Sequence, residues 1–345
     1  MCPGQAKIGQ GQNPAQGNGR TGNNSFGVAM PHIVVAGKIH ASGIALLTAA
    51  GASFDHVEAV AEQAYVSLIA AADALVIRTQ PLTAATIARA KRLQIVSRHG
   101  VGYDAVDVAA LTARRIPLCI VGAVNAVSVA EHAMMLILAA TKRLIRADHA
   151  VRDPAAWAWR NRMEAGELAG KTLLIVGYGR TGQLLARMAA GFGMTITAHD
   201  PGLAAQTWPA GAARAPDLHG GLARADVVSL HTPLTAPPLI GTAELAAMKR
   251  GAVLINTARG GLVDETALLA ALRSGHIAAA GLDVLGQEPP PASHPLLALD
   301  QVILTPHIAG ITGESAERMA VASVQNVLDF FAGRLDPALI VNQGF

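Results

Sequence analysis

The chain has 345 residues, 51% of them apolar and 3% aromatic, with 27 Lys and Arg against 24 Asp and Glu. That length allows two domains with sizeable cores. The basic residues occur as scattered pairs, which argues against a nucleic-acid partner. No apolar segment approaches the roughly 18 residues of a membrane span, so no membrane partner is expected. Cys2 and Cys119 lie far apart in the sequence and predict neither a disulfide framework nor a zinc site or other metal site.

The first 29 residues are rich in Gly, Gln and Asn and lack both a periodic pattern and the apolar core of a signal peptide. They predict a disordered tail. The globular pattern starts at Met30, so a chain that begins there is expected to fold and to keep its activity. With no signal core and no membrane span, the expected location is the cytoplasm.

Strands and helices alternate along residues 30–123. Apolar runs predict the strands and helical spacing predicts the helices, with Thr83 placed to cap one of them. Cys119 lies in the last apolar run and is expected to be a buried thiol. Alternation of this kind indicates the α/β class with a parallel, doubly wound sheet. The predicted strands are 32–37, 74–77, 93–97 and 116–121, and the predicted helices are 41–50, 84–92 and 107–114.

A second series of elements follows a long, almost wholly apolar helix predicted over residues 127–146. This helix should be buried on most faces, which suits a domain or subunit interface. Helical sequence continues to about residue 162. The closing helix, 313–333, comes after the second sheet is complete and is expected to return to the first domain. Between them we predict strands at 172–176, 194–199, 226–230, 252–256, 277–283 and 302–305, and helices at 183–192, 242–248 and 265–273.

A glycine-rich turn joins the strand 172–176 to the helix after it, in the order Gly177-Tyr-Gly179-Arg-Thr-Gly182. Gly177 allows a tight turn, Gly179 lets the backbone approach a pyrophosphate, and Gly182 lets the helix pack close to the strand. The free N–H groups of the helix N-terminus favour a negatively charged group. The glycine pattern alone is weak evidence, but strand, glycines, helix and strand in this order predict a dinucleotide site.

Asp200 ends the next strand, eighteen positions after Gly182, where a dinucleotide fold places a carboxylate for the ribose hydroxyls of the adenosine. This carboxylate would repel a 2′-phosphate, and no arginine follows it closely. NAD is therefore favoured over NADP. The alternative is that Asp200 only forms the turn before Pro201 and Gly202.

Polar residues follow several of the predicted strands directly, and in open parallel sheets ligands bind beyond the carboxyl ends of the strands. The polar residues that follow strands in this way are His231 and Thr232, the segment 256–261, Asp283, Glu288 in the loop after it, and His307.

Together these stretches resemble the D-isomer-specific 2-hydroxyacid dehydrogenase family. The resemblance covers about residues 31–340 and rests on seven segments in family order: 100–104, 125–134, 177–200, 231–235, 255–264, 281–289 and 305–310. It implies two Rossmann-like, doubly wound domains. A discontinuous substrate domain would comprise residues 30–123 and 312–345, and an NAD-binding domain residues 124–311. Family members are usually homodimers joined through the cofactor domains.

The resemblance also implies a catalytic trio of Arg259, Glu288 and His307. Arg259 would bind the substrate carboxylate and help to polarise the carbonyl. His307 would be the general acid–base, and Glu288 would accept a hydrogen bond from its other ring nitrogen and stabilise the charged imidazole. Taken singly, each has a structural alternative. His307 could be a buried histidine, Glu288 a surface charge, and Arg259 the partner of Asp264.

Further binding residues are carried over from the same resemblance. Asp283 matches the acid that bonds the nicotinamide carboxamide, and the amides of Val101 and Gly102 match a loop that holds the substrate carboxylate, although a simple glycine turn is the alternative there. Asn125 matches a residue at the substrate and domain junction, and it also suits an N-cap. The expected cofactor-binding residues are Gly177, Gly179, Arg180, Thr181, Gly182, Asp200, His231, Thr232, Pro233, Thr257, Ala258, Arg259, Asp283, His307 and Gly310. The expected substrate-binding residues are Arg78, Val101, Gly102, Asn125, Arg259 and His307.

The expected function is an NAD-dependent oxidoreductase that interconverts a small (R)-2-hydroxy acid and its 2-oxo acid. Arg78 resembles a phosphate-binding arginine of phosphoglycerate dehydrogenases, which favours an oxo acid with a second anionic end; the alternative is a solvated charge at a helix entry. A glyoxylate/hydroxypyruvate-type reductase that does not use Arg78 stays open. So does a non-enzymatic NAD(H)-sensing binder, because corepressors that resemble this family keep the same three residues.

Overall fold

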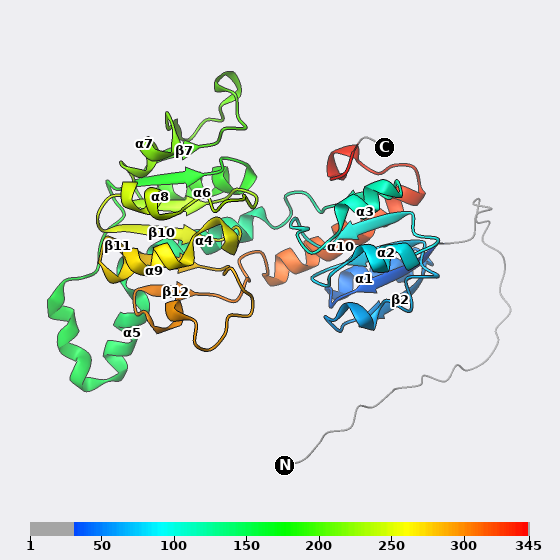
Figure 1. Cartoon of the computed structure of the whole chain (residues 1–345), viewed down its shortest axis with the longest axis horizontal. Helices are drawn as coiled ribbons and strands as arrows, with labels where there is room; N and C mark the ends of the chain where they lie inside the picture. Colours follow the sequence, from blue (N-terminus) through cyan, green and yellow to red (C-terminus); the bar gives the residue numbers. More distant parts are fainter. Residues whose placement is uncertain (1–30, 344–345) are drawn as a thin grey trace, which may run out of the picture.

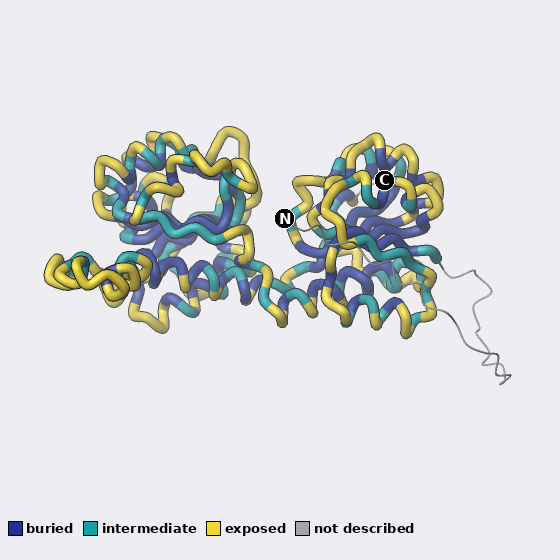
Figure 2. Tube along the Cα trace, turned by 90° about the horizontal axis from the view of Figure 1, so that it is seen from below, coloured by how far each residue is buried: buried dark blue, intermediate teal, exposed yellow. Residues whose placement is uncertain are grey.

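The computed structural model describes residues 31–343, which form two lobes that each contain one parallel sheet (Figure 1). The predicted α/β class with two doubly wound parallel sheets is confirmed. The tail predicted for residues 1–29 lies outside the described residues. In both lobes the buried strands lie between helices whose outer faces are exposed (Figure 2).

The first lobe holds a five-stranded sheet in the order β2-β1-β3-β4-β5, with every pair parallel. Thr83 caps α2 as predicted, accepting from the backbone N–H of Thr86 at 3.4 Å. The strands are β1 (His32–Ala36), β2 (Ser53–Val57), β3 (Ala74–Ile77), β4 (Ile95–Arg98) and β5 (Leu118–Cys119). The helices are α1 (Ala41–Ala49), η1 (Glu62–Ala64), α2 (Ala84–Arg89) and α3 (Val108–Ala113).

The end of the chain also packs on this first sheet. The helix α10 (Gly313–Phe331) lies against α1, β3 and β4, and its buried side chains Ala320, Val324 and Val327 join the core of the first lobe. After η6 (Pro337–Leu339), Asn342 accepts a hydrogen bond from the Leu118 N–H at 2.8 Å and donates one to the Ile116 carbonyl at 3.0 Å. The lobe is therefore assembled from both ends of the described chain.

The second lobe holds a seven-stranded parallel sheet in the order β12-β11-β10-β9-β6-β7-β8. The order reverses between β6 and β9, which makes this the switch point where doubly wound sheets bind ligands. Its strands are β6 (Thr172–Val176), β7 (Thr195–His199), β8 (Ala213–Arg214), β9 (Val227–Leu230), β10 (Ala252–Asn256), β11 (Ile277–Leu282) and β12 (Val302–Leu304). Its helices are α4 (Ala126–Lys142), α5 (Leu144–Arg152), η2 (Pro154–Arg162), α6 (Arg180–Gly191), η3 (Ala205–Thr207), α7 (Leu218–Leu222), α8 (Thr242–Ala247), η4 (Gly260–Leu262), α9 (Glu265–Arg273) and η5 (Pro295–Ala298).

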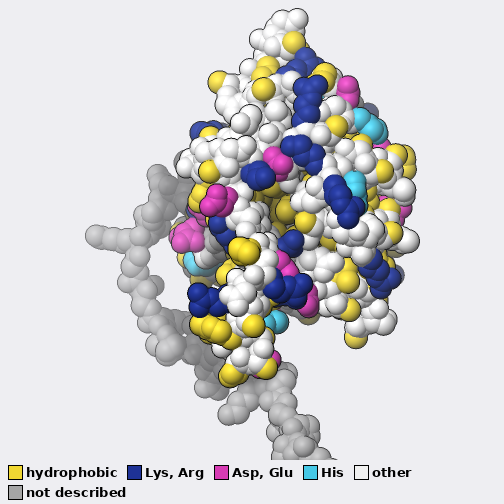
Figure 3. Space-filling view, turned by 90° about the vertical axis from the view of Figure 1, so that its left-hand side faces the viewer, with side chains coloured by type: hydrophobic (Ala, Val, Ile, Leu, Met, Phe, Trp, Pro, Cys, Tyr) yellow, Lys and Arg dark blue, Asp and Glu magenta, His cyan; other side chains and the backbone are white. Residues whose placement is uncertain are grey.

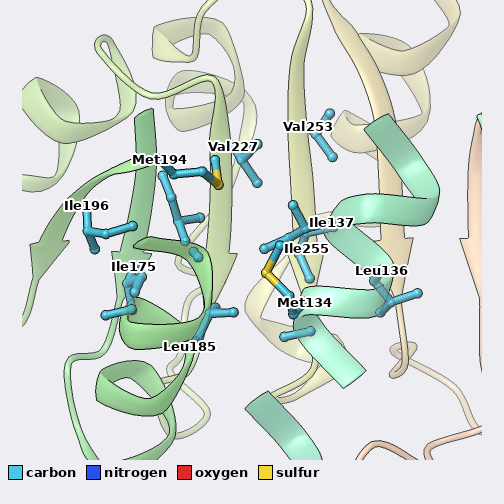
Figure 4. Close-up of a cluster of buried hydrophobic side chains, with 14 of the residues drawn as sticks. Met134, Leu136, Ile137, Ile175, Leu185, Met194, Ile196, Val227, Val253 and Ile255 are labelled. Carbon is cyan, nitrogen blue, oxygen red and sulfur yellow. The ribbon is translucent and has the colours of Figure 1, made fainter. Parts of the chain in front are cut away.

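One of the two apolar cores of the second lobe forms where α4 packs on α6, β10 and β11. Met134, Leu136 and Ile137 of α4 point toward apolar side chains of the sheet and of α6, including Ile255 and Leu185 (Figure 4). The predicted burial of this helix is confirmed over most of its length. In the part of the chain that the structure describes, no helix has the length and apolar character required to cross a membrane.

The long helix predicted over residues 127–146 is wrong in one respect, because it breaks at Arg143. This residue adopts a left-handed conformation with φ of 56°, so α4 ends and α5 starts in a new direction. The Arg143 guanidinium donates to the Ala278 carbonyl at 2.8 Å, a contact that no local sequence pattern reveals. Beyond α5 the expected helix is the 3₁₀ segment η2, which begins at Pro154.

Apart from short 3₁₀ helices, two strands and one α-helix were not predicted. The edge strand β2 carries polar residues and no clear alternation, and β8 has only two exposed residues. The helix α7 contains Gly220 and Gly221, which are poor helix formers, and it is stabilised by Asp217, whose carboxylate accepts from the Gly220 N–H at 2.7 Å.

Two smaller predictions are borne out. Cys119 is a buried free thiol, and burial raises its pKa to about 12. On the face shown in Figure 3, Lys and Arg side chains are interspersed with acidic and apolar ones, as the scattered basic pairs predicted.

Candidate active site

Six neighbouring strands of the second sheet end at one edge, because they all pair in parallel. The glycine turn follows β6 and Asp200 follows β7. The remaining strands, β9 to β12, are followed by His231, Thr257, Asp283 and Thr305 in turn. The sheet therefore gathers at one edge the side chains that the sequence singled out.

The glycine turn has the backbone that its sequence predicted. Gly177 has φ of 94°, and a Cβ there would lie 2.6 Å from the carbonyl oxygen of His231. A Cβ on Gly182 would collide with the Gly177 carbonyl, whereas Gly179 faces open space. In the described residues the backbone N–H groups of Arg180, Thr181 and Gly182 donate to no acceptor, so the start of α6 suits an anionic group.

Asp200 links the end of β7 to the glycine turn. One carboxylate oxygen accepts from the Tyr178 N–H at 2.8 Å, and the other accepts from the Gly202 N–H at 2.9 Å. Asp200 therefore does stabilise the turn before Pro201 and Gly202. This structural role does not exclude a contact with the ribose hydroxyls of the adenosine. Each oxygen keeps a lone pair for a further donor.

Two buried hydroxyls that follow neighbouring strands at this edge have no hydrogen-bond partner within residues 31–343: Thr232 Oγ1 and Thr257 Oγ1. Buried hydroxyls are normally paired, so these two fit a ligand with polar groups of its own. Next to them, His231 Nε2 lies 2.8 Å from Ser229 Oγ, and desolvation lowers the pKa of His231 to about 4. Pro233 is exposed at the start of the following loop, and Ala258 donates its N–H to the Asn256 side chain at 3.0 Å.

His307 and Glu288 form a direct pair. His307 Nδ1 lies 2.7 Å from Glu288 Oε2, and the other carboxylate oxygen accepts from the Leu285 N–H at 3.0 Å. The His307 side chain is 53% exposed, so the alternative of a buried histidine is wrong. Its Nε2 has no partner in the described part of the chain, which leaves this nitrogen available for proton transfer.

Asp283 holds the loop that carries His307. The residue is 1% exposed, and its Oδ1 accepts from Thr305 Oγ1 at 2.6 Å and from the Ile308 N–H at 2.9 Å. Its Oδ2 accepts from the Ala309 N–H at 2.8 Å and keeps one lone pair. Asp283 thus supports the loop in addition to any contact with a cofactor amide. His132 of α4 extends the network, with Nε2 at 2.9 Å from Thr305 Oγ1.

Arg259 contacts the first lobe. Its Nε donates to Asp104 Oδ2 at 2.8 Å and its Nη1 to the Ala258 carbonyl at 2.7 Å. The alternative pairing with Asp264 is wrong, because that carboxylate caps α9. A Cβ on Gly102 would collide with the Arg259 guanidinium, so the guanidinium lies directly on the loop after β4.

The amides of Val101 and Gly102 in that loop donate to no acceptor among the described residues, which suits the predicted capture of a carboxylate. Asn125 stands at the N-cap position of α4, but its side chain makes no capping hydrogen bond, so the expected cap is wrong. Its amide instead lies beside Gly310, where a Cβ would be 2.8 Å from Asn125 Nδ2.

Sequence reasoning missed several residues of this site. Arg98 lies beside Arg78 and Arg259, and its pKa falls to about 10 because of burial and of these two neighbouring cations. A Cβ on Gly260 would collide with the Leu285 backbone, so the loops of Arg259 and Glu288 are packed together. The sequence analysis named Gly260 within the segment 256–261, but it did not predict this packing. Glu265 also supports the second loop, accepting from the Gly286 N–H at 2.8 Å.

Comparison with known proteins agrees with this geometry. The family model described as D-isomer specific 2-hydroxyacid dehydrogenase, NAD binding domain, matches residues 134–309. A D-3-phosphoglycerate dehydrogenase of Mycobacterium leprae is 43% identical over 277 residues, which are 77% of this chain and 50% of that protein. A glyoxylate reductase of Korarchaeum cryptofilum is 41% identical over 274 residues, 78% of this chain and 82% of that protein. The TT0316 protein of Thermus thermophilus superposes with a TM-score of 0.82 at 35% identity, covering 90% of this chain and 99% of that structure.

The chain belongs to the D-isomer-specific 2-hydroxyacid dehydrogenase family, as the sequence motifs indicated. Its second sheet carries the NAD-binding domain of that family. The chain spans about half the length of the M. leprae phosphoglycerate dehydrogenase that it matches.

Replacing Gly177 by alanine should weaken NADH binding at least about fivefold, since a side chain at positive φ against a backbone carbonyl costs about 1 kcal/mol or more. NADH fluorescence titration measures the effect. Gly191→Ala on the same helix, where a Cβ meets no atom within 4 Å, is the matched control and should leave the affinity unchanged. Equal affinities for both variants would contradict the assignment of the turn.

Proposed function

We propose that this protein is an NAD-dependent dehydrogenase that interconverts a small (R)-2-hydroxy acid and its 2-oxo acid. The observation that carries the proposal is the His307–Glu288 pair at 2.7 Å, which lies at the same sheet edge as the glycine turn and the Arg259 guanidinium. This edge combines an acid–base group, an anion-binding group and a dinucleotide turn.

Arg259 binds the substrate carboxylate in this proposal and helps to polarise the adjacent carbonyl. The free amides of Val101 and Gly102 belong to the loop on which this guanidinium lies at Gly102, so the carboxylate would be held by charge and by backbone donors together. Asn125, beside Gly310, is proposed as a further substrate contact at the junction of the lobes.

His307 gives a proton to the carbonyl oxygen during reduction and takes one from the hydroxyl during oxidation. Its free Nε2 is the atom that acts. Glu288 fixes the ring through Nδ1 and stabilises the positive imidazole with its carboxylate. The Leu285 N–H orients that carboxylate in turn.

The residues around the glycine turn fit a dinucleotide. Its pyrophosphate would meet the free N–H groups of Arg180, Thr181 and Gly182, and the unpartnered Thr232 and Thr257 hydroxyls would take polar groups of the cofactor. His231, Pro233, Ala258, Asp283 and Gly310 complete the proposed set. When bound, the nicotinamide supplies or accepts the hydride. Asp200 favours NAD over NADP because its carboxylate repels a 2′-phosphate.

Two further arginines support an oxo acid with a second anionic end, as in a phosphoglycerate-type enzyme. Arg78 and Arg98 form no ion pair within residues 31–343, and both lie close enough to each other to interact electrostatically. Two neighbouring guanidiniums, of which Arg98 also lies beside Arg259, suit a dianion such as a phosphate. A glyoxylate/hydroxypyruvate-type reductase is the second candidate. Relatives of both kinds match the chain at similar identity.

We further propose that residues 30–123 with 312–345 form the substrate domain and residues 124–311 the NAD-binding domain. This division follows the two sheets and the packing of α10 on the first. A homodimer joined through the NAD-binding domain is supported by α5 and η2, which project from the second lobe (Figure 1). Their exposed apolar side chains are Leu144, Ile145, Val151 and Trp157.

The first test is turnover. NADH oxidation followed by absorbance with a panel of 2-oxo acids should show activity with at least one of them. An NAD(H)-sensing binder would bind NADH and turn over none.

His307→Ala should lower kcat by about 10²- to 10⁴-fold, the usual contribution of a general acid–base. NADH affinity should stay nearly unchanged, because the imidazole acts on the substrate oxygen. Steady-state kinetics and NADH fluorescence measure the two effects separately. An equal loss of cofactor affinity would mean that His307 has a different role.

Asp200→Ala should reduce the preference for NADH over NADPH about tenfold, because the charge that repels the 2′-phosphate is removed. The ratio of kcat/KM for the two cofactors is the measurement. Glu167→Ala removes an exposed charge before β6, at the opposite edge of the sheet, and should leave the ratio as it is. An unchanged ratio in Asp200→Ala would refute the ribose assignment.

Arg78→Ala should lower kcat/KM for a phosphorylated 2-oxo acid about 10- to 100-fold, since a hydrogen bond to a charged group contributes about 1.5–3 kcal/mol. Glyoxylate should be affected far less. Arg89→Ala, which removes an exposed arginine at the end of α2, is the control. If the Arg78 variant slowed both substrates equally, the phosphoglycerate-type proposal would fail.

A further inference from the structure

One ion pair joins the two lobes. Among residues 31–343, every other ion pair connects residues of the same lobe, and only Asp104 and Arg259 pair across from the loop after β4 to the loop after β10. The two residues are 155 positions apart in the sequence. Arg259, the residue proposed to bind the substrate carboxylate, is therefore also the residue through which this ion pair links the two lobes.

The geometry of this ion pair limits how Arg259 can bind the carboxylate of a substrate in addition to that of Asp104. Arginine commonly holds a carboxylate with two parallel N–H groups. Here Asp104 Oδ2 already occupies Nε, and Nη1 has given one hydrogen to the Ala258 carbonyl. The guanidinium rests on Gly102 on its Nη2 side. The edge formed by Nε and Nη2 is thus closed to a substrate carboxylate as long as Asp104 stays in place.

We propose that Asp104 is a built-in carboxylate that competes with the substrate carboxylate for Arg259. It thereby weakens substrate binding and holds the two lobes together until substrate replaces it. This inference rests on the proposed function, because it takes Arg259 as the substrate-binding arginine.

Asp104 is suited to being displaced. Its side chain is 52% exposed, it makes one hydrogen bond, and it sits in a loop that contains Gly100 and Gly102. The contrast is with Asp73, whose carboxylate is 10% exposed and bonds both Arg92 and the His32 N–H. A half-exposed pair contributes little to stability, so a substrate that brings its own carboxylate and further contacts can take its place.

The surrounding charges indicate that loss of the Asp104 charge should strengthen the binding of an anionic substrate. Arg98 lies near both Arg78 and Arg259, and Asp104 is the acidic neighbour that offsets these two cations at Arg98. Removing the Asp104 charge leaves this cluster more positive and weakens the hydrogen bond to Nε of Arg259, because a neutral amide oxygen is a weaker acceptor than a carboxylate. Both changes favour an anionic substrate.

The kinetic test compares wild type with Asp104→Asn, which keeps the shape of the side chain and removes its charge. With saturating NADH, the variant should show a KM for its 2-oxo acid about two- to fivefold lower, the range that a half-exposed ion pair supports, with kcat changed less. Glu58→Gln is the matched control. It removes an exposed charge from the same lobe, and Glu58 makes no ion pair within the described residues. A higher KM with a lower kcat in Asp104→Asn would overturn the proposal, because it would show that Asp104 aligns Arg259 for the substrate.

The structural test does not depend on turnover. Small-angle X-ray scattering without substrate should give a larger radius of gyration for Asp104→Asn than for wild type or Glu58→Gln. Raising the salt concentration from about 0.05 to about 0.5 M should increase the radius of gyration of the wild type toward that of Asp104→Asn, because salt screens an exposed ion pair. Equal radii would refute the link between the lobes. If wild type turned over no 2-oxo acid, the proposed function would fail, while this scattering comparison would still decide whether Asp104 joins the lobes.

Discussion

Parallel pairing from β12 to β7 is the constraint on which the candidate site depends. It places the ends of six strands at one edge, so that residues from Gly177 to His307 become neighbours although 130 positions of sequence separate them. The reversal of strand order between β6 and β9 then leaves the glycine turn accessible beside the other strand ends. Loops at this edge can vary in chemistry while the sheet keeps them in place.

Asp283 shows how that edge is stabilised. A carboxylate that is 1% exposed is costly unless its oxygens are paired, and here three donors from the segment after β12 satisfy it. The same hydrogen bonds fix the backbone around His307, which adopts φ of 55°, an uncommon value for a residue with a side chain. A buried charge and a residue at positive φ thus support each other.

The sequence predicted the features that depend on residues close together in the chain. The apolar runs of β6 and β10, the cap at Thr83 and the glycines 177 and 182 all have short-range signals, and each lies where it was expected. What was missed depends on partners distant in the sequence. Arg143 is held by the Ala278 carbonyl, and Arg98 is perturbed by Arg259. Edge strands such as β2 carry too few buried residues to show a periodic pattern.

The close packing of Gly260 on the Leu285 backbone has a mechanical consequence. With no space between them, the segment that bears Arg259 and the segment that bears Glu288 cannot slide past each other, and Glu288 is bonded to His307. The three side chains therefore belong to one rigid body. Any hinge movement between the lobes changes how far this body lies from Gly102, but it leaves the spacing within the trio intact.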